Sequence, residues 1–357
     1  MTPRVEFLSL EVEDFGPFRG YQSFDFATGA SEGKSALTVI TGGGGSGKTS
    51  LVSALRLALW GPGRLSLDQG LRYEGHVRGS PGFWPRHVDS EALTSRRPRA
   101  YARVTLRAVA EEGVAKHVVI ERSVREEEDR IATTLWVDAV KEGEDASLTD
   151  EGDFSTRIAG VLPEGRCGHM FAGSELFDRL AGLASGDPRL RRLALREVAA
   201  LKGFRALETW RKVGAAVVEF GNRLLAVRSD LRLLPDDPGG PPPGAQLVVP
   251  GVWVSREATD VTDLACIGCA LVVGLHLSKD AKLPLVLDAP ALRMMPGPGT
   301  VLLEALSEIK PSQVTIFAHE EQVDDLVLSM WDRVRRAYLI ERAVDGRTVL
   351  LSEPVTK

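Results

Sequence analysis

Hydrophobic and polar positions alternate at the start of the chain and then change to a helical spacing. The alternation over residues 5–10 and 21–26, on either side of Gly16-Pro17, predicts an antiparallel pair of strands. The β-branched run at 36–41 predicts another strand, and apolar residues spaced by three and four over 50–60 predict a helix directly after a glycine-rich loop. The chain therefore opens with strands that lead through this loop into a helix.

The middle of the chain changes from strand patterns to helical and then loop-like composition. Strands separated by Glu-rich turns predict a β-meander at residues 101–110, 115–124 and 131–137. Apolar residues recurring every three or four positions predict helix from 187 to about 229, with a basic face. The segment 236–244, DDPGGPPPG, favours neither helix nor strand, and 65–99 is expected to be a surface loop.

Helices and strands alternate in the last third of the chain. Helices are predicted at 263–277, 301–309 and 320–330, and strands at 283–287, 313–318, 336–344 and 347–351. Together with the strand–loop–helix unit near the N-terminus, this order favours an α/β fold with a mixed central sheet, an antiparallel β layer and a short helical projection. The expected parts are an N-terminal lobe at 1–186, a helical projection at 187–235, a linker at 236–250 and a C-terminal lobe at 251–357.

Composition narrows the classes of protein to consider. The chain has 357 residues and a net charge of −5, which argues against coating nucleic acid through bulk charge. Three cysteines cannot form a disulfide framework, and the N-terminus lacks the apolar core of a signal peptide. No apolar run approaches the roughly 20 residues needed to cross a bilayer. We therefore expect a cytoplasmic protein that is not embedded in a membrane.

The glycine-rich loop has the spacing of a phosphate-binding loop. Residues 42–49, GGGGSGKT, match G-x-x-x-x-G-K-[ST] between a predicted strand and a predicted helix. The glycines let backbone amides turn toward phosphates, Lys48 reaches the terminal phosphates, and Thr49 offers its hydroxyl to Mg²⁺. The predicted site for ATP and Mg²⁺ comprises Gly42, Gly43, Gly44, Gly45, Ser46, Gly47, Lys48, Thr49 and Ser50.

Two polar residues follow buried strands in the C-terminal third. Asp288 ends LPLVLDAP, where a P-loop protein places the carboxylate that holds Mg²⁺, and His319 follows the strand at 313–318. Asp288, His319 and Lys48 are thus the candidate catalytic residues, with Thr49 and Asp288 at the metal. A histidine at a strand end is by itself more often a cap or a surface residue.

Two further groups of residues have competing interpretations. The helical region 189–212 offers either a solvated basic face or a contact with DNA phosphates, through Arg189, Arg191, Arg192, Arg196, Lys202, Arg205, Arg211 and Lys212. Cys266 and Cys269, with Cys167 and His169 upstream, have the residue types of a zinc site. An apolar helix with small residues explains the cysteine pair well enough without a metal.

With these motifs placed, the chain resembles the ABC-type ATPases of DNA repair and chromosome maintenance: SMC proteins, SbcC, RecN and RecF. The residues of its motifs are most similar to those of DndD-type DNA-restriction ATPases. The likeness covers about residues 4–62 and 260–345, and it rests on DFGPFRG at 14–20, GGGGSGKT, LALWGP at 57–62, LPLVLDAPALRM and VTIFAH.

The resemblance implies roles for individual residues. Arg19 would approach the nucleotide phosphates, Lys48 and Thr49 would bind phosphate and Mg²⁺, Asp288 would be the Walker B aspartate, and His319 would sense the γ-phosphate. It also implies a homodimer, or a heteromeric complex with a nuclease or effector subunit, that closes around ATP. The expected function is an SMC-like head that hydrolyses ATP and controls a DNA repair, restriction or phage-defence complex.

The chain departs from the family pattern in several places. The signature helix should begin with a motif such as LSGGE, whereas residues 259–263 read TDVTD and place Asp260 where serine would meet the γ-phosphate. Ala289 stands where a carboxylate often orients water, MFAGSE at 170–175 has no glutamine, and about 40 helical residues replace the long coiled coil. These departures favour an alternative, a head that binds ATP as a structural or sensory subunit without useful turnover. A transporter-type or unrelated P-loop enzyme is a third interpretation.

Overall fold

The computed structural model groups the chain into two compact units. The first contains residues 1–29, 36–163 and 334–357, and the second contains 30–35 and 164–333. The lobe boundaries expected from the sequence, at 186, 235 and 250, stay a prediction. The structure describes residues 4–28, 36–60, 99–109, 115–127, 130–137, 170–173, 180–184, 187–192, 194, 207–227, 230–237, 240, 243–249, 251–258, 260–280, 283–289, 296–308, 313–320, 334–342 and 348–350.

An antiparallel sheet forms one layer of the first unit. Its strands run in the order β2-β1-β4-β5-β6, and every neighbouring pair is antiparallel. These strands are β1 (Arg4–Glu13), β2 (Tyr21–Asp25), β4 (Arg99–Val109), β5 (Ala115–Glu127) and β6 (Arg130–Val137). The predicted opening pair and the predicted β-meander are thus both confirmed, and they belong to one sheet.

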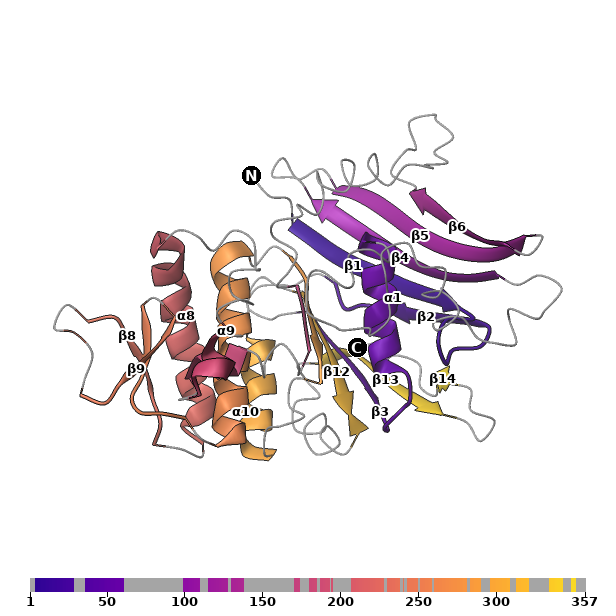
Figure 1. Cartoon of the computed structure of the whole chain (residues 1–357). Helices are drawn as coiled ribbons and strands as arrows, with labels where there is room; N and C mark the ends of the chain where they lie inside the picture. The colour runs from indigo at the N-terminus through magenta and orange to yellow at the C-terminus, as the bar shows by residue number, and fades with distance from the viewer. Residues whose placement is uncertain are drawn as a thin grey trace. The chain divides into compact units, whose positions relative to one another are not determined.

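One face of this sheet is apolar and packs against helix α1 (Lys48–Trp60). A bulge between Phe7 and Ser9 interrupts the alternation of β1, so that Phe7 lies opposite Leu106 and Leu10 opposite Val104 on β4. These four side chains share the covered face and are fully buried. Arg122 of β5 donates from Nε to the carbonyl oxygen of Ala58 in α1, at 3.3 Å. Figure 1 shows α1 lying along this sheet.

The opposite face carries paired charges across the strands. Arg103 lies 2.9 Å from Glu11 and 2.6 Å from Glu121, while Arg107 pairs with Glu6. Burial alone would lower the pKa of Arg103, but the hydrogen bond and charge of Glu121 raise it above its ordinary value. Because each pair joins directly opposed residues, these charges favour one register of the strands.

Three further strands of the first unit include the one that leads into the glycine-rich loop and two from the end of the described chain. They are β3 (Ala36–Gly42), β13 (Val334–Arg342) and β14 (Thr348–Leu350). Strand β13 runs parallel to β3 and antiparallel to β14, so the arrangement is mixed. The hydroxyl of Tyr338 on β13 donates to the carbonyl oxygen of Asp25 at 2.8 Å, and burial raises the pKa of Tyr338. This contact joins β13 to the end of β2.

The second unit combines helices with two small sets of strands. Its three longer described helices are α8 (Leu207–Leu225), α9 (Val261–Asp280) and α10 (Pro296–Ser307). Parallel strands in the order β12-β11-β7 are β12 (Gln313–His319), β11 (Leu285–Asp288) and β7 (Phe171–Gly173). An antiparallel sheet in the order β8-β10-β9 comprises β8 (Leu233–Pro235), β10 (Val252–Val254) and β9 (Gln246–Val249).

Helices α8 and α9 lie side by side, as Figure 1 shows, because glycine allows their backbones to approach. A Cβ atom added at Gly274 of α9 would stand 3.0 Å from the backbone nitrogen of Val217 in α8. Val213 and Phe220 of α8 are buried together with Val217. The described part of the predicted basic helix therefore buries its apolar stripe within the second unit.

The predicted α/β fold class is confirmed, with local differences. Residues 246–249 fall inside the stretch 236–250 expected to be a linker, but they form strand β9, paired with β10. The predicted loop at 65–99 lies outside the described residues except for its last member, and the predicted helix at 320–330 lies outside them beyond its first. In the part of the chain that the structure describes, no helix is long and apolar enough to cross a membrane.

Candidate functional site

The glycine-rich loop joins the end of β3 to the start of α1, as its sequence predicts. Gly45 has a φ of +75° and Gly47 a φ of +99°, conformations that residues with a Cβ atom rarely adopt. Leu51 donates its amide to the carbonyl oxygen of Gly47 at 3.1 Å, so helical hydrogen bonding begins within the loop motif. The first amides of α1 are therefore directed into the loop, where helix geometry favours an anion.

Lys48 is folded into the concave side of the loop. Its Nζ atom lies 2.5 Å from the carbonyl oxygen of Gly42, 2.7 Å from that of Gly43 and 3.2 Å from Oγ of Ser46. Lys48 and Ser46 are both buried. The loop thus holds a positive charge at its centre, surrounded by backbone groups.

The predicted DFGPFRG motif forms a closed turn that packs against the loop. Oδ1 of Asp14 accepts a hydrogen bond of 2.7 Å from the amide of Gly20, which closes the turn at its two ends. A Cβ atom on Gly47 would lie 2.7 Å from Cγ of Pro17 and 3.0 Å from the ring of Phe18. The turn therefore fixes the half-buried Arg19 beside the loop.

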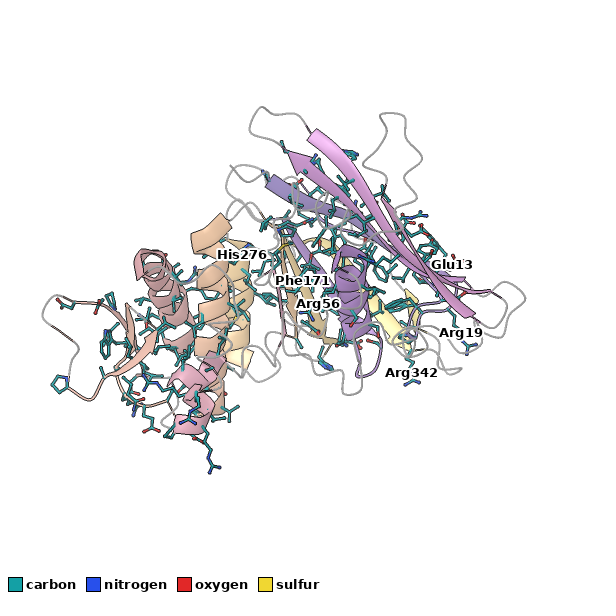
Figure 2. The ribbon with its side chains drawn as sticks, turned by 45° about the horizontal axis from the view of Figure 1, so that its top comes forward. Glu13, Arg19, Arg56, Phe171, His276 and Arg342 are labelled. Atoms are coloured by element: carbon teal, nitrogen blue, oxygen red, sulfur yellow. The ribbon has the colours of Figure 1, made fainter. Side chains whose placement is uncertain are left out.

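Two residues of the C-terminal strands reach the same loop and were not singled out by the sequence patterns. Oγ1 of Thr348 donates to the carbonyl oxygen of Ser46 at 3.0 Å, and its amide donates to the carbonyl oxygen of Pro17 at 2.9 Å. Arg342 ends β13, and its Nη1 would lie 3.7 Å from a Cβ atom on Gly45. Figure 2 shows Arg19 and Arg342 at the same end of this unit.

The residue types and exposure of the loop suit a nucleotide with a divalent cation. Gly44, Gly45 and Thr49 are exposed, and Gly43 and Ser50 are half-buried, so a ligand can reach the loop from solvent. Backbone amides and the Lys48 ammonium are the donors that phosphate oxygens require, and the hydroxyl of Thr49 at the start of α1 is a suitable Mg²⁺ ligand. These groups fit the predicted ATP and Mg²⁺.

Asp288 and His319 lie together in the second unit. Strands β11 and β12 are parallel neighbours with Asp288 opposite Phe317, which places both residues at the carboxyl ends of the strands. Each is half-buried. Ala289 follows Asp288 with a φ of +49° and donates its amide to the carbonyl oxygen of Phe317 at 2.7 Å. The sequence thus located this strand edge, and the roles of Asp288 and His319 stay a prediction.

Asp260 has a structural role that the sequence interpretation missed. Its Oδ1 accepts hydrogen bonds from the amides of Thr262 at 2.8 Å and Asp263 at 3.4 Å, and its carbonyl oxygen accepts the amide of Leu264. These are the contacts of a helix N-cap, here for α9. The signal was present in the sequence, because an aspartate directly before an apolar helix is a typical capping residue. The carboxylate of Asp260 is therefore hydrogen-bonded to backbone amides of its own helix.

The remaining predicted groups are placed only in part. Cys266 and Cys269 are buried on α9, and burial raises the pKa of Cys269 well above its ordinary value, with Cys266 adding to the shift. Cys167 and His169 lie outside the described residues. In the basic region, Arg189 and Arg192 are exposed, whereas Arg191 donates to the carbonyl oxygen of Leu247 at 2.8 Å. The side chains of Arg196, Lys202, Arg205, Arg211 and Lys212 lie outside the described set.

Comparison with known proteins finds similarity in sequence and in fold. Residues 9–154 match a family model described as an AAA domain. The head of an Smc protein bound to the C-terminal winged-helix domain of ScpA aligns with a TM-score of 0.59 at 16% identity, over 98% of each chain.

Two other SMC heads align comparably. An Smc head from Pyrococcus furiosus, bound to the C-terminal domain of ScpA, gives a TM-score of 0.56 at 14% identity, over 98% of this chain and 97% of that one. The SMC head domain from Thermotoga maritima gives 0.52 at 14% identity, over 99% and 100%. No curated protein sequence matches the chain significantly. Residues 9–154 are therefore similar to an AAA domain, and the chain has the fold of an SMC head domain.

Proposed function

We propose that this chain binds and hydrolyses ATP with Mg²⁺, and that its nucleotide state controls a DNA repair, restriction or phage-defence complex through association of heads. The observation that carries the proposal is the loop between β3 and α1, in which Lys48 stands among inward-facing backbone groups. A buried ammonium held by carbonyl oxygens is a strong site for a phosphate, because the phosphate brings the negative charge that the carbonyls lack.

The resemblance assigns the remaining roles in this reaction. Lys48 binds the terminal phosphates, Thr49 and Asp288 hold Mg²⁺, and His319 senses the γ-phosphate. Arg19 approaches the phosphates from the turn packed on the loop. The metal ion would neutralise charge that develops during phosphoryl transfer.

The proposal extends to partners. Two similar heads of known structure are bound to domains of ScpA, so the fold supports docking of a partner protein as well as pairing of heads. We propose a homodimer, or a heteromeric complex with a nuclease or effector subunit, in the cytoplasm. The exposed Arg189 and Arg192 support local contact with DNA phosphates through the helical region 189–212.

The direct test is phosphate release from ATP by the purified chain, with and without DNA, beside Lys48→Ala. Turnover that disappears in Lys48→Ala and rises with DNA supports an ATPase of the repair or defence type. Lys116→Ala replaces a lysine of strand β5, outside the loop motif, and serves as the matched control. ATP binding that survives Lys48→Ala would contradict the proposed site.

A second function, ATP binding without useful turnover, is favoured by two observations. Ala289 offers no carboxylate to orient water after Asp288, and the N-terminal amides of α9 are already engaged by Asp260. A sensory head of this kind would bind ATP through Lys48 but release no phosphate, with or without DNA. Equilibrium binding and phosphate release on the same preparation separate the two functions.

A further inference from the structure

We infer that Thr348 is a positioning residue of the nucleotide loop, acting through the peptide that joins Ser46 to Gly47. This inference rests on the proposed function of the loop as an ATP site. Thr348 is 2% exposed and makes two hydrogen bonds to different segments, from Oγ1 to the carbonyl oxygen of Ser46 and from its amide to that of Pro17.

The first hydrogen bond sets the direction of a phosphate donor. In a trans peptide the carbonyl and the following N–H point in opposite directions. With the carbonyl oxygen of Ser46 held by Thr348, the N–H of Gly47 points away from Thr348. The Nζ atom of Lys48 lies 3.2 Å from Oγ of the same Ser46. Gly47 has a φ of +99°, a backbone conformation that glycine adopts easily and other residues rarely adopt.

The second hydrogen bond connects the loop with the turn that bears Arg19. The amide of Thr348 holds Pro17, and Pro17 and Phe18 in turn contact Gly47. A parallel bridge between Phe18 and Thr348 adds to this connection. Thr348 thus holds two nucleotide-facing segments in one arrangement before any ligand is present, which reduces the entropy lost on binding.

The hydroxyl can be removed almost without changing shape. Thr348→Val replaces the hydroxyl by a methyl group and keeps the backbone amide, whereas Thr348→Ser keeps the hydroxyl and loses the methyl. Losing one neutral hydrogen bond corresponds to about a fivefold change in an equilibrium constant. We therefore expect Thr348→Val to raise the Kd for both ATP and ADP about fivefold or more, and Thr348→Ser to stay near wild type.

The test compares Kd values for ATP and ADP, by calorimetry, with thermal unfolding of each ligand-free variant. A purely structural role for the hydroxyl would lower the unfolding temperature of Thr348→Val and leave the Kd of the folded fraction unchanged, which overturns the inference. If Thr348→Val does not fold, Thr348→Ala beside Thr348→Ser gives the same comparison. If every variant that lacks the hydroxyl binds ATP as tightly as the wild type, the inference about Thr348 is wrong but the proposed function stands. If the wild-type chain itself does not bind ATP, both the inference and the proposed function are wrong.

Discussion

The Nζ atom of Lys48 lies 2.5 Å from the carbonyl oxygen of Gly42, so the ammonium charge is directed into the loop and away from solvent. This arrangement places the charge where a phosphate would compete with the backbone carbonyls for it. Lys48 needs no large movement to meet such a ligand, because the loop already surrounds it.

Mg-ATP is therefore expected to stabilise the wild-type chain and to have no effect on Lys48→Ala. A ligand present at a hundred times its Kd adds about 2.7 kcal/mol to the free energy of unfolding. That gain raises Tm by several degrees, which thermal unfolding followed by fluorescence detects. Adenosine lacks phosphate and should stabilise neither protein. An equal shift with Lys48→Ala would show that ATP binds elsewhere.

Arg342 is expected to strengthen nucleotide binding from the exposed end of β13. Its guanidinium lies beside Gly45, where a phosphate could accept a charge-assisted hydrogen bond. Arg342→Gln should raise the Kd for ATP about tenfold at low salt, with a smaller effect at high salt because ions screen exposed charges. The neighbouring Glu341 points to the opposite side of the strand, so Glu341→Gln is the control. Equal affinities of Arg342→Gln and the wild type would exclude this contact.

Gly47 is expected to tolerate no larger residue. An alanine there would adopt a φ of +99° and would place its Cβ atom 2.7 Å from Pro17. Strain in the left-handed region and overpacking together should lower the free energy of unfolding by about 2–4 kcal/mol. Gly43→Ala is the matched control, because nothing lies within 4 Å of a Cβ atom at that position. Denaturant unfolding measures both, and equal stability of the two variants would contradict this packing.

Asp260 is expected to stabilise α9 as its N-cap. Asp260→Ala should lower the free energy of unfolding by about 1 kcal/mol. Asp260→Asn should keep most of the stabilisation that the cap provides, since asparagine also caps helices well. Chemical denaturation measures the difference. If Asp260→Ala instead raises the free energy of unfolding, the negative charge of Asp260 destabilises the fold by more than its capping hydrogen bonds stabilise it.

Tyr101 is expected to ionise at a higher pH than an ordinary tyrosine. Burial raises the pKa of Tyr101 to about 12. The positive charge of Arg103 lowers this pKa by a smaller amount, and the negative charges of Glu13 and Glu11 raise it further. Because the folded pKa lies above the unfolded value of about 10, the stabilisation is complete below pH 10 and is lost as pH rises through 12.

Absorbance of tyrosinate at 295 nm follows this titration. Tyr101→Phe should remove a component near pH 12, and its free energy of unfolding should fall less steeply than that of the wild type between pH 10 and 12. The variant is needed because burial also raises the pKa of Tyr338. An unchanged titration at high pH would place the late component on another tyrosine.

Local patterns predicted the parts of the site that are contiguous in sequence. The loop around Lys48 has a fixed spacing, and the strand before it and the helix after it have clear periodicities, so each supports the other. Asp288 was located because a buried apolar strand ends there. The cap at Asp260 is equally local, but it stands at a position for which the family resemblance implies a different role.

Residues that depend on pairing of distant strands could not be found in this way. Thr348 and Arg342 reach the loop because β13 runs parallel to β3 with Leu339 opposite Thr41, a register that no short pattern specifies. Strand β9 was missed because four residues after a Pro- and Gly-rich segment carry little periodicity, and its pairing with β10 supplies the missing hydrogen bonds.

The hydrogen bond between Thr348 and Ser46 joins residues 302 positions apart. A ribosome producing this chain makes the glycine-rich loop early and the residue that orients it some three hundred amino acids later. During that interval the nascent loop lacks its β14 contact, and closing so long a segment is slow compared with forming a helix. Nucleotide affinity would then reach its full value only late in synthesis, once β14 has paired with β13.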